Sequence, residues 1–422
     1  MTHANFADDE AGAQPPAGVQ PQAGAQPQAG AQPQAGVQPQ ARVQVGSQAG
    51  LLAAVPHLLG FHPARSLVVL GVAGPHDRVS LAFRYDLPDP ADAELAADIA
   101  EHAGTVLARE AIGAVALVGY GPASLVTQAL DAVVGVLLRR GLEIREVLRA
   151  DGGRYWSALC QDPACCPADG VSYDPCSHPV AATLASQAGK DALPDREALA
   201  RTLQPEPGSA RLVREATRRA LRRLDRLMRV AEQAGRDPSA ALAEAGRRAV
   251  RQAIARYQSG GRVTERGPLA FLAVTLADLR VRDDAWARMD PEHCAAHLRL
   301  WTDVVTGAAP EFVPAAASLL AFTAWQSGDG ALANVAVDRA LAADPAYSMA
   351  LLIAEAVQGG LPPSFARLSM TPEEVAASYA AQPEQADQSA EAPPAKKQPA
   401  KTQPGSGPGG RPAPEPPAAR AG

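Results

Sequence analysis

The chain has 422 residues, of which 47% are hydrophobic and only 4% aromatic, so its cores must be built mainly from alanine, leucine and valine. This length accommodates two or three domains, at roughly 100–200 residues each. The net charge of −6 is mild for the length, so no global electrostatic field favours nucleic acid or a membrane surface.

Several features bear on where the protein works. The first residues contain neither a basic stretch nor an apolar one, so a secretory signal is not expected. No run approaches the roughly 18 apolar residues of a membrane-spanning helix. Five cysteines, an odd number, argue against a secreted disulfide scaffold. We therefore expect a cytoplasmic protein with no membrane partner.

Both ends of the chain have a low-complexity composition. Residues 14–41 repeat Gln-Pro-Gln-Ala-Gly-Ala with little variation, and proline every sixth residue blocks helices and sheet ladders. From residue 382 onward the chain is again rich in proline, glutamine, alanine and glycine. We predict disordered segments at 1–46 and 382–422.

Residues 47–178 carry the pattern of an α/β domain. Apolar residues recur at helical spacing over 48–59, and the apolar runs at 67–72 and 114–120 are typical of strands buried on both faces. Residues 79–87 alternate as in a strand buried on one face. Further helices are expected near 90–110, with Asp89 as N-cap and Pro90 in first position, and from 122 to 140.

The end of this domain is predicted to form a hairpin. Strands at 144–149 and 154–160 flank the turn Asp151-Gly152-Gly153, and a cysteine-rich loop follows them. The order of elements predicts a mixed sheet with helices packed on it.

Residues 179–381 are predicted to form an all-helical domain, because strand signals disappear and apolar stripes at helical spacing recur. Within it, a set of residues matches one tetratricopeptide unit: Leu320, Ala321, Ala333, Ala340 and Pro345. A single unit cannot form a peptide-binding groove, so we expect a helical hairpin that serves in packing.

The cysteine-rich loop is the first candidate site. Cys160, Cys165, Cys176 and His178 lie within nineteen positions and offer the thiolate and imidazole ligands of tetrahedral zinc. Their spacing departs from that of paired zinc knuckles, and the adjacent Cys165 and Cys166 are not expected to point inward together. A reversible disulfide, or small apolar residues at the mouth of a loop, are the alternatives. Zinc is the one cofactor that the sequence suggests.

An arginine-rich helix is the second candidate. Residues 211–229 hold eight arginines against Glu215 and Asp225, and five of them define a positive face: Arg214, Arg218, Arg222, Arg226 and Arg229. Such a face can neutralise phosphates without reading sequence. No aromatic residue interleaves it, which argues against a stacking platform for single strands. A solvated face that pairs with acidic neighbours is the alternative.

Two segments of the α/β domain are weaker candidates. Residues 119–122 (GYGP) precede a helix, where main-chain amides can hold an anion, but they lack the Walker lysine and the three-glycine spacing, so a tight turn is the alternative. His57, His62 and Arg65 crowd one segment without a paired carboxylate or cysteine, and a surface or capping role is expected. No complete catalytic motif occurs, and enzymatic activity is left open.

Several segments resemble those of a known family. They are LLGFHP at 58–63 with SLVVL at 66–70, GRYWS at 153–157, Cys160 with Cys165-Cys166-Pro167 and Gly170, and the late pairs Ala324-Trp325, Gly328-Asp329 and Asp344-Pro345 with Tyr347. They resemble the actinobacterial domain-of-unknown-function family 4192 over most of residues 48–368. The resemblance implies one recurring cytoplasmic architecture, with no activity, substrate or site residue.

Two functional hypotheses follow from the sequence. The first is an interaction or scaffold protein that holds a protein partner or, as a less favoured partner, nucleic acid. The second is an enzyme or a redox or metal sensor whose site lies near residues 160–178. The first is favoured because the chain has helical-repeat character and no complete catalytic set.

Overall fold

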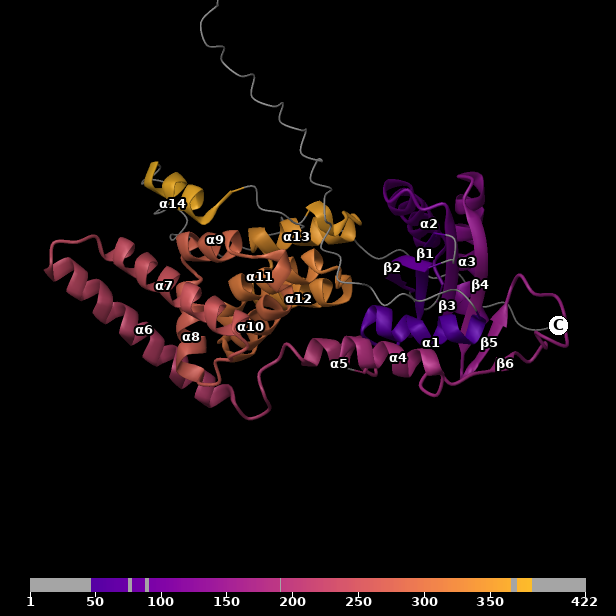
Figure 1. Ribbon diagram of the computed structural model, residues 1–422, viewed down its shortest axis with the longest axis horizontal. Helices are drawn as coiled ribbons and strands as arrows, with labels where there is room; N and C mark the ends of the chain where they lie inside the picture. The colour runs from indigo at the N-terminus through magenta and orange to yellow at the C-terminus, as the bar shows by residue number, and fades with distance from the viewer. Residues whose placement is uncertain (1–46, 75–77, 88–90, 190, 366–369, 382–422) are drawn as a thin grey trace, which may run out of the picture.

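The computed structural model describes residues 47–74, 78–87, 91–189, 191–365 and 370–381 (Figure 1). The segments predicted to be disordered, 1–46 and 382–422, lie outside the described residues, as do Asp89 and Pro90. Within the described residues, a mixed sheet with flanking helices is followed by a helical region, as the sequence predicts.

One six-stranded sheet forms the first half, in the order β2-β1-β3-β4-β5-β6. Its strands are β1 (Ser66–Ala73), β2 (Arg78–Asp86), β3 (Ala114–Tyr120), β4 (Glu143–Asp151), β5 (Arg154–Ser157) and β6 (Val171–Ser172). The β3–β4 pair is parallel because helix α3 (Ala123–Arg139) crosses between the two strands, and the other described pairs are antiparallel. The two apolar runs form the central strands β1 and β3.

Helices cover both faces of this sheet. Helices α2 (Ala93–Arg109) and α3 pack on the face that carries Leu67 and Val69 of β1. Helix α1 (Gln48–Leu59) packs on the face that carries Val68 and Leu70, with α4 (Pro179–Ala188) beside it (Figure 1). Because successive strand residues point to opposite faces, a strand covered on both sides needs an unbroken apolar run.

Helix α2 begins later than predicted. Its N-cap is Asp92, whose carboxylate accepts hydrogen bonds from the main-chain N–H groups of Glu94 and Leu95. The prediction that Asp89 caps this helix was therefore wrong. Asp89 and Asp92 are equally good capping residues by type, so the local sequence does not distinguish them.

The second half is helical. Its helices are α5 (Arg196–Arg201), α6 (Ala210–Gln233), α7 (Pro238–Gln258), α8 (Arg266–Thr275), α9 (Leu279–Ala287), α10 (Cys294–Gly307), α11 (Val313–Gln326), α12 (Gly330–Ala343), α13 (Ser348–Gln358) and α14 (Pro372–Ala381). Helices α11 and α12 form a close antiparallel hairpin. Asp329 is the N-cap of α12. Among the described helices, none combines the length and the apolarity needed to cross a membrane.

A single hydrophobic core joins the two halves. It extends from the α1 face of the sheet through the α5 region into the helices, and includes Leu52, Val68, Leu203, Trp301 and Leu320. Helix α4, although it follows residue 178, packs against α1. The domain boundary predicted between residues 178 and 179 stays a prediction.

Side-chain hydrogen bonds join α5 to α12 within the helical half, and α2 to the end of α13 between the two halves. Arg196 of α5 donates a hydrogen bond to the carboxylate of Asp338 in α12 at 2.6 Å. Arg109 at the end of α2 donates to the main-chain carbonyl of Gly359 at 2.8 Å. The Arg109 contact holds α2, which covers one face of the sheet, against the end of α13.

Candidate thiol site

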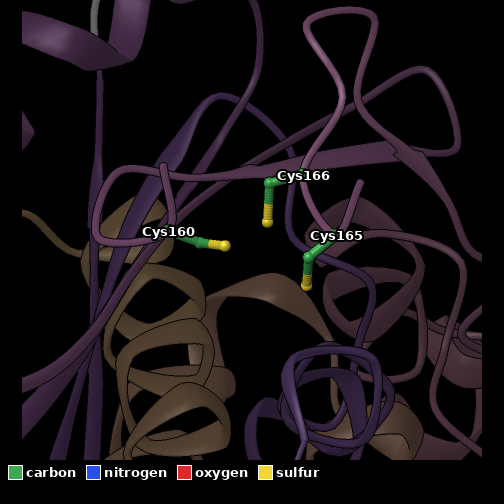
Figure 2. Close-up of side chains that lie close together, drawn as sticks. All are labelled: Cys160, Cys165 and Cys166. Carbon is green, nitrogen blue, oxygen red and sulfur yellow. The ribbon is translucent and has the colours of Figure 1, made fainter. Parts of the chain in front are cut away.

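Three thiols gather in the loop that follows β5. The sulfur atoms of Cys160, Cys165 and Cys166 all lie within 4.8 Å of one another, and Figure 2 shows the three side chains gathered at the loop. Cys165 is exposed, and the other two are half-buried. The site is therefore open to solvent on at least one side.

Ser157 ends β5 and positions Cys160. The Ser157 hydroxyl accepts hydrogen bonds from the main-chain N–H groups of Leu159 and Cys160, both at 3.2 Å, and donates to the Glu146 carboxylate at 2.7 Å. Glu146 also accepts from the side-chain amide of Gln48 at 3.0 Å. Cys160 is thereby tied to β4 and α1, and the strand ends at Ser157 rather than at residue 160 as predicted.

Asp162 positions the other two cysteines. Its carbonyl oxygen accepts from the N–H groups of Cys165 at 3.1 Å and Cys166 at 2.7 Å, and its carboxylate accepts from the N–H of Ala164 at 2.9 Å. In such a helix-like turn, consecutive side chains are rotated by about 100° rather than pointing to opposite sides. Both neighbours therefore reach Cys160, contrary to the expectation from their adjacency.

The far end of the loop closes on Trp156. The indole N–H donates to the carbonyl of Ala168 at 3.0 Å, and the Arg149 guanidinium lies 3.4 Å from the ring centre. Gly170 has φ +80°, and a Cβ there would lie 2.6 Å from Trp156 Cε2. Only glycine combines this conformation with this contact, so it is required for the loop to close.

The thiols influence one another's protonation. A hydrogen bond between Cys160 and Cys166 lowers the pKa of Cys160 and raises the pKa of Cys166 to about 12. A main-chain hydrogen bond at Asp162 lowers the pKa of Cys160 further. Burial and then the nearby thiols raise the pKa of Tyr155, so its hydroxyl keeps its proton. The arrangement favours a thiolate at Cys160 that is hydrogen-bonded by the Cys166 thiol.

The structure brings together only Cys160 and Cys165 of the four predicted ligands. Cys176 and His178 join no metal-ligating cluster among the described residues. His178 caps α4, where its Nδ1 accepts from the N–H of Val180 at 3.2 Å. The third thiol of the cluster is Cys166, which the sequence did not suggest as a ligand.

The separation has a simple geometric cause. Strand β6 runs antiparallel to β5, with Val171 opposite Tyr155 and Ser172 opposite Arg154. The loop that holds Cys160 leaves one end of β5, whereas the chain leading to Cys176 emerges at the other end. The short strand β6, which the sequence does not predict, therefore places Cys176 and His178 away from the three clustered thiols.

The arginine face lies elsewhere. Helix α6 is at the end of the molecule opposite to β5 and β6 (Figure 1). Its five predicted arginines are all exposed: Arg214, Arg218, Arg222, Arg226 and Arg229. In the described part of the chain, no ion pair joins these five to an acidic side chain, while Arg211 pairs with Glu215 at 3.0 Å. The face is positive and accessible, and it is not part of the thiol site.

The other two sequence candidates lie in the turn before α3 and at the end of α1 with the segment after it. Residues 119–122 make a tight turn in which Gly121 has φ +136° and donates its N–H to the carbonyl of Ala150, so that amide is not free for an anion. His62 donates its main-chain N–H to the carbonyl of Leu193. Burial first, and the nearby His62 second, lower the pKa of His57.

No pattern in the sequence predicts the large cavity between the sheet and the helical region. Its volume is about 770 Å³, and residues of β2 and α2 line it together with residues of α11, α12 and α13. Inside it, the hydroxyl of Tyr85 and Nδ1 of His102 lie 2.6 Å apart. The walls are more than 200 positions apart in the chain, and only the tertiary fold brings them together.

Comparison with known proteins identifies one family. Residues 49–364 match the family model described as Domain of unknown function (DUF4192), which confirms the resemblance predicted from the sequence. No curated protein and no solved structure matches the chain. The match spans the sheet, the thiol loop and the helical region as far as residue 364.

Proposed function

The chain belongs to the DUF4192 family, whose description assigns no activity, and we propose that it binds one thiophilic metal ion, zinc foremost, through Cys160, Cys165 and Cys166. One observation carries the proposal: three sulfur atoms within 4.8 Å of one another. The proposal makes the protein a metal-binding or metal-sensing protein rather than one with a purely structural cysteine loop.

The geometry of the sulfurs supports this function. Around zinc, with Zn–S bonds of about 2.3 Å, three thiolates of a tetrahedral site lie about 3.8 Å apart. Small side-chain rotations bring sulfurs within 4.8 Å to that spacing. Soft thiolate ligands favour zinc or copper(I) over hard cations. Among the described residues no fourth ligand joins the three thiols, so a bound metal would keep one position open.

The main chain supports it as well. Ser157 and Asp162 hold the cysteine backbones by hydrogen bonds, so little of the loop has to be ordered when metal binds. Each thiol must lose its proton to become a ligand. With the pKa of Cys166 near 12, metal affinity is expected to rise with pH.

The test compares Cys166→Ser with Cys176→Ser in the full chain, purified without a histidine tag under reducing conditions. We expect one zinc per chain in the wild type and in Cys176→Ser, and at least a tenfold loss of zinc affinity in Cys166→Ser (~1.4 kcal/mol). Circular dichroism checks that both variants fold. Loss of zinc in Cys176→Ser alone would support the ligand set predicted from the sequence, and no zinc in the wild type would refute the proposal.

A second candidate function, a reversible disulfide, is favoured by the opposite pKa shifts of Cys160 and Cys166. The Cys160 thiolate attacks hydrogen peroxide and forms a sulfenic acid with release of hydroxide. The Cys166 thiol then displaces water and forms the disulfide. In metal-free protein treated with peroxide, we expect a Cys160–Cys166 disulfide that dithiothreitol reverses. Oxidation of Cys165 or Cys176 alone would contradict this candidate.

Other expectations also remain proposals. A cytoplasmic location is supported by the five free cysteines, which a reducing compartment preserves. A tetratricopeptide-like role for α11 and α12 is supported by their close hairpin. Nucleic-acid binding by α6 is supported by its exposed arginines. The actinobacterial source implied by the resemblance is likewise an expectation.

A further inference from the structure

Strand β2 is an edge of the sheet. It is the first strand in the order and, among the described strands, pairs only with β1. An edge strand presents a row of main-chain N–H and C=O groups to which another extended chain can bind. Proteins usually cover or interrupt such an edge, so its surroundings matter.

The register shows which groups face outward. The N–H of Leu87 donates to the carbonyl of Arg65 at 2.8 Å, one step beyond the pair Ser66–Asp86. In an antiparallel ladder the hydrogen-bonded pairs recur at every second residue. Phe83 and Tyr85 therefore direct their main-chain groups toward β1. The alternate residues, Ala82, Arg84 and Asp86, direct theirs away from the sheet.

These outward groups face the large cavity. Every residue from 80 to 86 lines this space of about 770 Å³, so the cavity follows the strand for about 20 Å instead of meeting it at one point. Asn334 and Asp338 of α12 and Leu361 after α13 line the same cavity. In Figure 1, β2 is the strand on the side of the sheet toward α13. The cavity is a groove with an open strand edge as one wall.

We propose that this groove binds an extended peptide segment, which adds to β2 as a further strand. Main-chain groups that alternate along a strand are complementary to the backbone of a second strand, and such pairing is an established mode of peptide recognition. A volume of about 770 Å³ suits a single peptide segment rather than the edge of a folded sheet. The site is independent of the thiol loop, which lies at the other edge of the sheet.

Side chains in the groove indicate the kind of peptide. Arg84 holds Asp86 through two hydrogen bonds, and Arg196 holds Asp338, so four of the five charged side chains that line the groove already neutralise one another. The fifth is Glu110. The groove therefore offers no strong field for a highly charged peptide.

Apolar and hydrogen-bonding groups remain for recognition. Phe61 lies under the Arg84 guanidinium at 5.5 Å, and Trp325 lines the helical side. Nε2 of His102 is buried and has no hydrogen-bond partner among the described residues. Because this Nε2 is shielded from the groove and the other lining groups are mostly apolar or already paired, we infer a peptide of largely uncharged residues with apolar side chains.

The experiment selects phage-displayed random linear peptides on the immobilised full-length chain, then measures affinity for the selected peptide by fluorescence polarisation. Ala82→Pro removes an outward N–H but no hydrogen bond to β1, and proline is tolerated on edge strands. Ala82→Ser is the matched control, because it keeps that N–H. We expect at least a tenfold loss of affinity in Ala82→Pro and no comparable loss in the control.

A second measurement does not depend on the folding of a variant. Each peptide bond of the selected peptide is N-methylated in turn, and binding to the wild type is measured. If the peptide adds to β2 as a strand, N-methylation should lower the affinity at every second residue of the peptide and leave it unchanged at the residues between. Failure to select any peptide, or losses without this period of two, would overturn the proposal. So would a dimer in light scattering that Ala82→Pro dissociates, since the occupant would then be a second copy.

Discussion

At the residue scale, His297 of α10 illustrates how burial changes side-chain chemistry. Its Nε2 accepts a hydrogen bond from the N–H of Asp290 at 3.4 Å, while its buried Nδ1 has no partner among the described residues. Burial is the main cause that lowers the pKa of His297 to about 4. Asp290 raises this pKa in part, and His293 lowers it. The ring is therefore neutral in the folded protein near neutral pH.

This predicts a loss of stability in mild acid. An unfolded histidine has a pKa near 6.5, so between about pH 6.5 and 4 the unfolded chain binds a proton that folded His297 does not. The stabilisation is complete above about pH 6.5 and is lost as the pH falls toward 4, by about 3 kcal/mol in total. Urea unfolding across this range should show a smaller pH dependence in His297→Gln than in the wild type. Equal pH dependence in the two proteins would contradict the prediction.

The thiol site was predictable from the sequence only in part. The density of cysteines indicates the loop after β5, and the sulfurs of three of them lie close together there. The choice among the five ligand candidates depended on a turn at Asp162 and on the two-residue strand β6. Neither the turn nor the strand has a strong signal in the local sequence. The sequence therefore predicts Cys176 rather than Cys166 as a ligand.

At the element scale, local patterns identified most helices and strands. The apolar runs became β1 and β3, and the capped amphipathic stripes became helices. The sheet order could not be predicted, because β1 pairs antiparallel with β3 across the whole of α2. Such pairings depend on long-range packing rather than on neighbouring residues.

Helix α6 allows a prediction about its positive face. Arg218 stands four residues from both Arg214 and Arg222, and like charges at this spacing destabilise a helix by about 0.2–0.5 kcal/mol per pair. Arg218→Glu replaces two repulsions by two attractions, but it also turns the attraction to Glu215, three residues earlier, into a repulsion. The net effect should be a stabilisation of up to about 1 kcal/mol at low salt. Thermal unfolding at low and high salt measures this, with Arg218→Gln as the control.

The same variants test the role of the arginine face. If α6 holds nucleic acid, Arg218→Glu should bind a labelled DNA duplex more weakly than Arg218→Gln does, although it is the more stable protein. Equal binding by the two variants would remove the nucleic-acid hypothesis. A destabilised Arg218→Glu would show that the arginines make contacts beyond mutual repulsion.

At the scale of the whole molecule, the two halves share a core. The sequence separated an α/β region from a helical region, because each has its own local periodicity. It did not show that Leu52 of α1 and Trp301 of α10 belong to one hydrophobic cluster, since these residues are about 250 positions apart. The groove along β2 is a consequence of this packing, because its two walls come from the two halves.

A shared core predicts that the two halves unfold together. In a Trp156→Phe background, the three remaining tryptophans, Trp286, Trp301 and Trp325, all lie in the helical region and report on it alone. Leu52→Ala removes a side chain that is 1% exposed in α1 and should cost about 2–5 kcal/mol. With a common transition, this change near the sheet lowers the urea midpoint of tryptophan fluorescence as much as that of circular dichroism. If the fluorescence midpoint stays unchanged, the halves unfold independently. The shared core would then contribute little to holding the two walls of the groove together.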